Sequence, residues 1–108
     1  MKLVEINLSG SNLERVKTLC ESLSKRFSGC TLYKTTGYWT EEGYWTEDSY
    51  EGITKEEGYG VKVLIDDSDD LNRLEKVIRV ELKDSDFKWV QVLSYEVNTH
   101  HVDLRVSL

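Results

Sequence analysis

The residues best suited to chemistry form a tandem repeat. Residues 37–42 read GYWTEE and residues 43–48 read GYWTED. Because a period of six is even, equivalent positions of two extended copies return to one face of a strand, and Trp39 and Trp45 then project together. Tryptophan faces beside carboxylates suit a cationic ligand or a basic protein surface. A hairpin whose aromatic residues pair across strands is the alternative. The predicted binding residues are Tyr38, Trp39, Glu41, Tyr44, Trp45, Glu47, Asp48 and Tyr50.

The segment around this repeat carries the charge imbalance of the whole chain. Residues 37–60 contain seven acids and one base, whereas the rest of the chain contains 13 of each. The segment also holds six of the 11 aromatic residues. A net charge of −6 opposes direct nucleic-acid binding, which needs clustered lysine and arginine. We therefore expect a small-molecule ligand or a basic protein as the partner.

His100, His101 and Asp103 are weak candidates for a metal site. Adjacent histidines on a strand point to opposite faces, so they do not chelate one ion together. One histidine would need carboxylates from elsewhere in the chain. A surface turn with two ordinary histidines is the simpler interpretation.

Other reactive side chains give no catalytic pattern. Residues 66–70 (DDSDD) lack the glycine and the distal glutamate of a calcium loop, so they are better explained as a helix start. Cys20 and Cys30 are too few for a disulfide framework and are expected to be reduced and partly buried. No catalytic residue is predicted, and no cofactor is identified.

Length and hydropathy indicate one domain spanning residues 1–108. No apolar run approaches the length of about 20 residues that crosses a bilayer. The first residues, MKLVE, become polar too early for a signal peptide. We expect a cytoplasmic protein without membrane contact.

Periodicity defines the elements that must position these residues. Residues 2–8 alternate as a strand, residues 13–27 carry a helical apolar stripe that stops at Gly29, and residues 31–40 are typical of a second strand. Ser11 and Glu14 have the spacing of a capping box at the helix start.

The second half repeats the pattern. It predicts a strand at 60–65, a helix that Ser68 caps, a strand at 87–97 and a short final strand at 102–107. Residues 37–60 then form a long loop. The result is an α+β ferredoxin-like βαββαβ sandwich, with two helices on one face of an antiparallel sheet and an extra C-terminal strand.

The strand at 87–97 has two apolar faces. Val90 and Val92 lie on one side, and Trp89, Leu93, Tyr95 and Val97 lie on the other. One helical layer covers only one sheet face, so the second face is expected to meet another subunit or the final strand. We predict a homo-oligomer.

The layout resembles the PII-like superfamily, which includes the PII signalling proteins and the CutA proteins. Residues 58–78 (GYGVKVLIDDSDDLNRLEKVI) are similar to the third strand and second helix of that family, and residues 31–50 (TLYKTTGYWTEEGYWTEDSY) are similar to small PII-like proteins. The resemblance places residues 37–60 at the effector-sensing loop and implies a trimer with ligands between subunits. It does not extend to ATP binding, because residues 83–87 (KDSDF) lack the glycine-rich turn, nor to a CutA metal role.

These observations favour a non-enzymatic, oligomeric, PII-like binding or regulatory module that engages a ligand or partner through its aromatic, acidic loop. One alternative is an acidic inhibitor that mimics nucleic acid, because the charge is segregated. A second alternative is a small metal- or histidine-dependent enzyme that uses His100 or His101 with a carboxylate.

Overall fold

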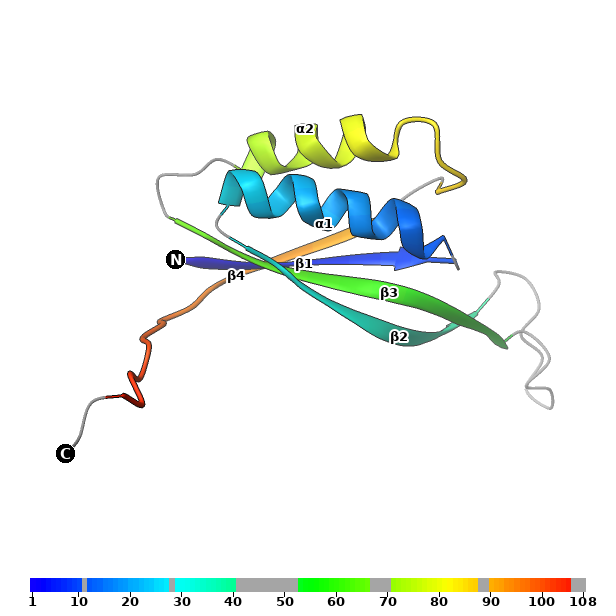
Figure 1. Ribbon diagram of the computed structural model, residues 1–108. Helices are drawn as coiled ribbons and strands as arrows, with labels where there is room; N and C mark the ends of the chain where they lie inside the picture. Colours follow the sequence, from blue (N-terminus) through cyan, green and yellow to red (C-terminus); the bar gives the residue numbers. More distant parts are fainter. Residues whose placement is uncertain (11, 28, 41–52, 67–70, 88–89, 106–108) are drawn as a thin grey trace.

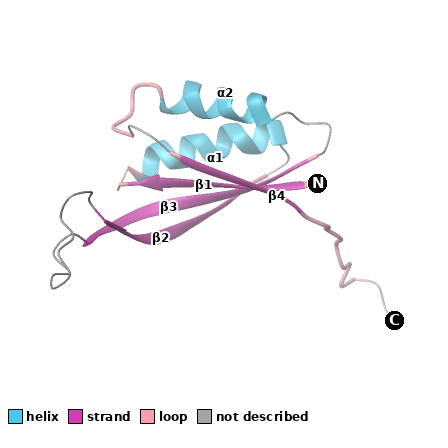
Figure 2. Ribbon diagram, turned by 180° about the vertical axis from the view of Figure 1, so that it is seen from behind, coloured by secondary structure: helices cyan, strands magenta, loops and turns pink. Residues whose placement is uncertain are grey.

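A computed structural model describes residues 1–10, 12–27, 29–40, 53–66, 71–87 and 90–105. One four-stranded sheet in the order β2-β3-β1-β4, with every pair antiparallel, carries two helices on one face, and its other face is uncovered (Figure 1). Figure 2 shows the same two layers from behind. The predicted ferredoxin-like βαββαβ fold is confirmed. Its elements are β1 (Lys2–Ser9), α1 (Leu13–Phe27), β2 (Thr31–Thr40), β3 (Ile53–Ile65), α2 (Leu71–Leu82) and β4 (Gln91–Glu96).

The core lies between the sheet and the helices. Alternate residues of β1 and β3 point toward the helices, and each helix contributes one apolar stripe. The contact is close because the buried strand residues are mostly β-branched and half of the buried helix residues are leucine. The buried apolar side chains are Val4, Ile6, Leu8, Val16, Leu19, Leu23, Phe27, Val61, Val63, Ile65, Leu74, Val77, Ile78 and Leu82.

Asn12 caps α1. Its side-chain Oδ1 accepts a hydrogen bond from the backbone N–H of Arg15 at 3.2 Å, and its carbonyl accepts from Val16 at 3.3 Å. The predicted capping box placed this role one residue earlier, at Ser11, which lies outside the described residues. With Asn12 at the cap, Glu14 is in the first turn, where a carboxylate opposes the helix dipole favourably.

The predicted loop 37–60 is largely a two-stranded ladder. β2 ends at Thr40, as predicted, but β3 begins at Ile53 instead of Gly60, so the predicted strand boundary was wrong. The high acid content hid the strand pattern, because cross-strand pairing tolerates polar residues on a solvated ladder. Only residues 41–52 of this segment lie outside the described residues.

Part of this ladder extends beyond β1. The pairing of β1 with β3 ends at Ser9 and Gly58, whereas β2 and β3 remain paired to Thr40 and Ile53. We call residues 36–40 and 53–57 the arm. In Figure 1 the arm twists away from the helices and leads into residues 41–52.

The C-terminal part differs from the prediction. β4 is shorter than the predicted strand at 87–97, and residues 97–105 contain no strand, so the extra C-terminal strand was wrong for the described residues. Val102 and Leu104 are 72% and 92% exposed. Alternation alone does not make a strand without a partner ladder, and this segment runs away from the sheet (Figure 1). Within the described residues, neither helix is long and apolar enough to span a membrane.

Candidate functional site

The uncovered face of the sheet is a mixed polar and apolar surface. Residues directly opposite each other in antiparallel strands point to the same face, so the register defines its members. Leu3, Glu5 and Asn7 of β1 alternate with the buried residues of that strand. Their partners on this face are Leu64, Lys62 and Gly60 of β3 and Tyr95, Leu93 and Gln91 of β4.

Glu5 is the centre of a network across four strands. Its Oε2 accepts a 2.6 Å hydrogen bond from the Tyr95 hydroxyl, and its Oε1 lies 3.8 Å from the Lys62 ammonium. The Lys62 ammonium also lies 5.1 Å from the ring centroid of Tyr33 on β2. The Glu5 side chain is only 20% exposed, so its charge is partly desolvated and needs these partners. The network therefore fixes side-chain positions on the uncovered face.

The two tyrosines in this network stay protonated at neutral pH. The hydrogen bond to Glu5 is the main cause that raises the pKa of Tyr95, and burial followed by the Glu5 charge raises the pKa of Tyr33. A phenol held in its neutral form donates hydrogen bonds and does not act as a general base. The network is suited to recognition and packing.

We expect the stability of the protein to fall as the pH rises above 10, the ordinary pKa of tyrosine. Because the folded-state pKa values of Tyr33 and Tyr95 exceed the unfolded values, the folded state binds these protons more tightly. Their contribution is complete below pH 10 and is lost as the pH rises through the folded-state values. Urea unfolding as a function of pH should show this decline.

The matched variants isolate the two phenols. Tyr33→Phe/Tyr95→Phe should show a shallower alkaline decline than wild type, and Tyr38→Phe, which changes an exposed tyrosine, should follow wild type. Parallel declines in the wild-type protein and the double variant would contradict the assignment.

Apolar side chains surround the network. Leu93 and Tyr95 are 37% and 43% exposed, whereas Val90 and Val92 pack against the core. The predicted division of this strand into a covered and an uncovered apolar side is confirmed. We expect this exposed apolar side to contact another molecule.

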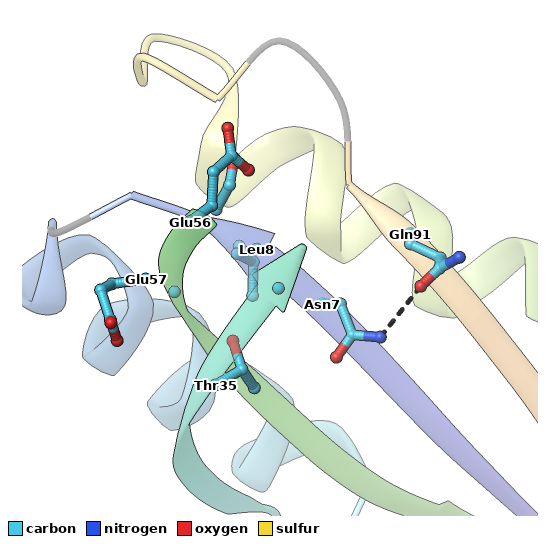
Figure 3. Close-up of a pocket in the computed structure, with 9 residues that line it drawn as sticks. Asn7, Leu8, Thr35, Glu56, Glu57 and Gln91 are labelled. Carbon is cyan, nitrogen blue, oxygen red and sulfur yellow. Dashed lines mark hydrogen bonds between the residues drawn. The ribbon is translucent and has the colours of Figure 1, made fainter. Parts of the chain in front are cut away.

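A small hollow lies where the arm leaves the sheet. Figure 3 shows Glu56 and Glu57 at its rim, with Asn7 donating a 3.1 Å hydrogen bond to Gln91 on its opposite side. Its volume is about 40 Å³, enough for one or two waters and too small for an organic ligand. Gly37 and Gly58 are among the residues that line the hollow.

The arm carries charged residues up to the edge of the described structure. Glu57 accepts a 3.2 Å hydrogen bond from the Thr36 hydroxyl and lies 3.7 Å from the Lys55 ammonium. Both contacts are exposed and contribute at most about 1 kcal/mol each. They order the base of the arm without neutralising Glu56.

The structure places two of the predicted binding residues on the arm. Tyr38 is 65% exposed, and Trp39 pairs through its backbone with Thr54 in the β2–β3 ladder. The arm therefore begins as an extended ladder, as the repeat analysis assumed for its first copy. The other predicted binding residues, Glu41, Tyr44, Trp45, Glu47, Asp48 and Tyr50, lie outside the described residues.

The weak metal candidates gain no support from the described residues. His100 and His101 are exposed, and Asp103 is held by Arg105, whose Nε lies 3.0 Å from Oδ1. Hydrogen bonds from the Arg105 side chain and backbone lower the pKa of Asp103. No group of three potential metal ligands occurs among the residues that the structure describes.

Sequence reasoning missed the network centred on Glu5. Glu5 alternates with Val4 and Ile6, so its position on the solvent side of β1 was predictable. The contacts with Lys62 and Tyr95 depend on the strand order and register, which pair Glu5 with Lys62 on one side and Leu93 on the other. The only sequence signal was one acid between apolar residues.

Comparison with protein-family models and with curated proteins gives no match. Solved structures do match. The Cut A1 divalent cation tolerance protein from Thermus thermophilus gives a TM-score of 0.66 at 10% identity, covering 94% of this chain and 88% of that chain. The periplasmic divalent cation tolerance protein CutA from Archaeoglobus fulgidus gives 0.63 at 10% identity with the same coverage. The PII-like protein CutA from Nostoc sp. PCC 7120 gives 0.62 at 15% identity, covering 91% and 82%.

These similarities cover nearly the whole chain, so the fold is that of the CutA and PII-like proteins. The resemblance stated from residues 31–50 and 58–78 is confirmed at the level of the fold. At 10 to 15% identity the similarity assigns no ligand or site residue.

Proposed function

We propose that this protein is a non-enzymatic, homo-oligomeric binding or regulatory module. Its arm and residues 41–52 form the element that engages a ligand or partner. The observation that carries this proposal is the arm itself, a two-stranded ladder that continues beyond the end of β1. A ladder that extends away from the core adds little to the core and presents its residues to other molecules.

The chemistry of the arm together with residues 41–52 favours a cationic partner. Residues 37–60 carry a charge of −6, and the repeat places two tryptophans among the acids. Aromatic faces and carboxylates together bind ammonium or guanidinium groups better than either does alone. We propose a basic protein surface or a cationic small molecule as the partner, and neither nucleic acid nor membrane.

The uncovered sheet face is the proposed contact between copies. Leu93 and Tyr95 expose apolar area there, and the network around Glu5 holds neighbouring side chains in fixed positions. A preorganised surface of this kind loses little side-chain entropy when it is covered. We favour a trimer, in which three copies place three arms on one assembly.

The Trp39→Ala/Trp45→Ala variant tests the binding element. Titration with an arginine-rich peptide, followed by isothermal calorimetry, should show binding to wild type and about five- to thirtyfold weaker binding to the variant, because two cation–π contacts contribute about 0.5–1 kcal/mol each. Circular dichroism should be unchanged. Wild-type binding should also weaken as salt is raised.

The matched control is Val80→Ala. Val80 is 73% exposed on α2, away from the arm, so this variant should bind the peptide as wild type does. Equal affinity of the tryptophan variant and wild type would overturn the role of the arm. Salt-insensitive binding would overturn the role of its charge.

We propose the cytoplasm as the compartment. The two cysteines are free thiols, which agrees with a reducing environment. Cell fractionation with an antibody should find the protein in the cytoplasmic fraction, and recovery from the periplasmic fraction would overturn this placement.

A further inference from the structure

Cys20 and Cys30 meet on the outer side of α1. Cys20 lies in the middle of the helix, and Cys30 directly precedes β2. The Cys30 thiol donates a hydrogen bond to the Cys20 carbonyl oxygen at 3.4 Å, and the Ser24 hydroxyl lies 3.4 Å from the same sulfur. The Cys30 sulfur therefore lies beside the Cys20 backbone, and a side-chain hydrogen bond also links the two cysteines, although ten positions separate them in the chain.

The thiol pair is open to small molecules. Both cysteines are half-buried, and both line a surface hollow together with Ser24, Lys25 and Leu32. On the side away from this hollow, Cys20 and Cys30 pack against the apolar core. The hollow is therefore the side from which we expect a small-molecule disulfide to approach the two cysteines.

We propose that Cys20 and Cys30 form a redox-responsive dithiol site, which closes to an intrachain disulfide by exchange with a small-molecule disulfide such as oxidised glutathione. Cys30 loses its proton to solvent and attacks one sulfur of the oxidant. A mixed disulfide forms, and the first glutathione leaves as a thiolate that takes up a proton. Cys20 then loses its proton to solvent and attacks the Cys30 sulfur, and the second glutathione leaves. Two protein thiols are oxidised, and one glutathione disulfide is reduced to two thiols.

The order of attack follows from the environment of Cys20. Burial, followed by the hydrogen bond and charge of Cys30, raises the pKa of Cys20 to about 12. Cys20 therefore stays protonated at neutral pH, which leaves Cys30 as the thiol that reacts first. Modification of Cys30 removes its hydrogen bond and charge from the causes that raise the pKa of Cys20, although burial remains, and the closeness of Cys20 to the mixed disulfide makes it the resolving thiol.

The bond would tie α1 to the start of β2, the strand that continues into the arm. A disulfide restricts the unfolded chain and so stabilises the folded state, even across a short loop such as residues 20–30. Oxidation would therefore strengthen the connection between α1 and the start of β2. The site is independent of the proposed binding function, because it lies at the opposite end of β2 from residues 41–52.

Mass spectrometry of the whole chain in glutathione redox buffers tests the proposal. In oxidised buffer the wild-type chain should lose two hydrogen masses with no glutathione attached, and both thiols should disappear together. The thermal midpoint should rise by at least about 5 °C and return on reduction. Under the same conditions Cys20→Ser should retain one glutathione on Cys30, whereas Cys30→Ser should stay unmodified.

Three results would overturn the proposal. They are persistent glutathione on the wild-type chain, disulfide-linked dimers in place of the intrachain bond, and thiols that resist oxidised buffer. An unchanged or lowered thermal midpoint would overturn the claim that the bond strengthens this connection between α1 and β2. The wild-type mass measurement needs no variant, so poor folding of a serine variant leaves the test intact.

Discussion

Replacement of Gly58 by alanine is expected to lower the free energy of unfolding by about 3 kcal/mol, a large share of the stability of a small domain. Among the residues of β3 that pair with β1, Gly58 is the one nearest the arm. A methyl group at this position would overlap the carbonyl oxygen of Leu8 and would lie 3.2 Å from the Cα of Ser9. Both obstacles are backbone atoms, so the two strands must separate to admit it.

Gly60→Ala is the matched comparison. A methyl group there would overlap the ring of Tyr33, which is a side chain that can rotate away. The expected loss is about 1 kcal/mol, from the displaced ring and its weakened contact with Lys62. Urea unfolding measures both variants. Similar losses at the two positions, or a stable Gly58→Ala variant, would contradict this account of where the arm meets the sheet.

The second large effect is expected on assembly. Leu93→Asp should convert the proposed oligomer into a monomer, because it places a charge on the proposed contact surface, opposite Glu5. Two carboxylates facing each other across neighbouring strands also repel. Light scattering coupled to size exclusion should report the 12.5 kDa mass of one chain for this variant.

Two further variants separate assembly from folding. Leu93→Lys removes the repulsion with Glu5 but keeps a charge on the surface, so it should also be monomeric. Val80→Asp changes a residue that is 73% exposed on α2, and it should assemble as wild type does. An oligomer of unchanged size in both Leu93 variants, with native circular dichroism, would remove the uncovered face from the interface.

The sequence was sufficient for the fold because each element has a distinct period. Val4, Ile6 and Leu8 fix one face of β1, and the stripe that includes Val16 and Leu23 fixes the buried side of α1. The same periodicity predicted that Leu93 and Tyr95 lie on the side away from the core. These predictions need only local spacing.

Features that depend on pairing were harder to predict. Residues 53–57 were assigned to a loop because three of them are charged, yet β2 offers each of them a partner. Val102 and Leu104 have the spacing of a strand, but no described strand lies beside them, and they stay exposed. In both cases the missing information was the neighbouring strand.

The candidate site was only partly predictable for the same reason. Tyr38 and Trp39 were placed in a strand from the threonine and aromatic content of residues 31–40, and the structure puts them in β2. The contacts among Glu5, Lys62 and Tyr95 join residues as far apart as 90 positions in the chain. Only the sheet order brings them together.

Native mass spectrometry of the protein, purified gently from its own host, tests the central claim most directly, because it reports subunit number and retained partner together. We predict an assembly of several 12.5 kDa chains, three being favoured, with the added mass of a bound basic protein or cationic ligand. The partner should be lost from Trp39→Ala/Trp45→Ala while the assembly remains. A single chain of 12.5 kDa with nothing bound would contradict the proposal that this protein is an oligomeric binding module.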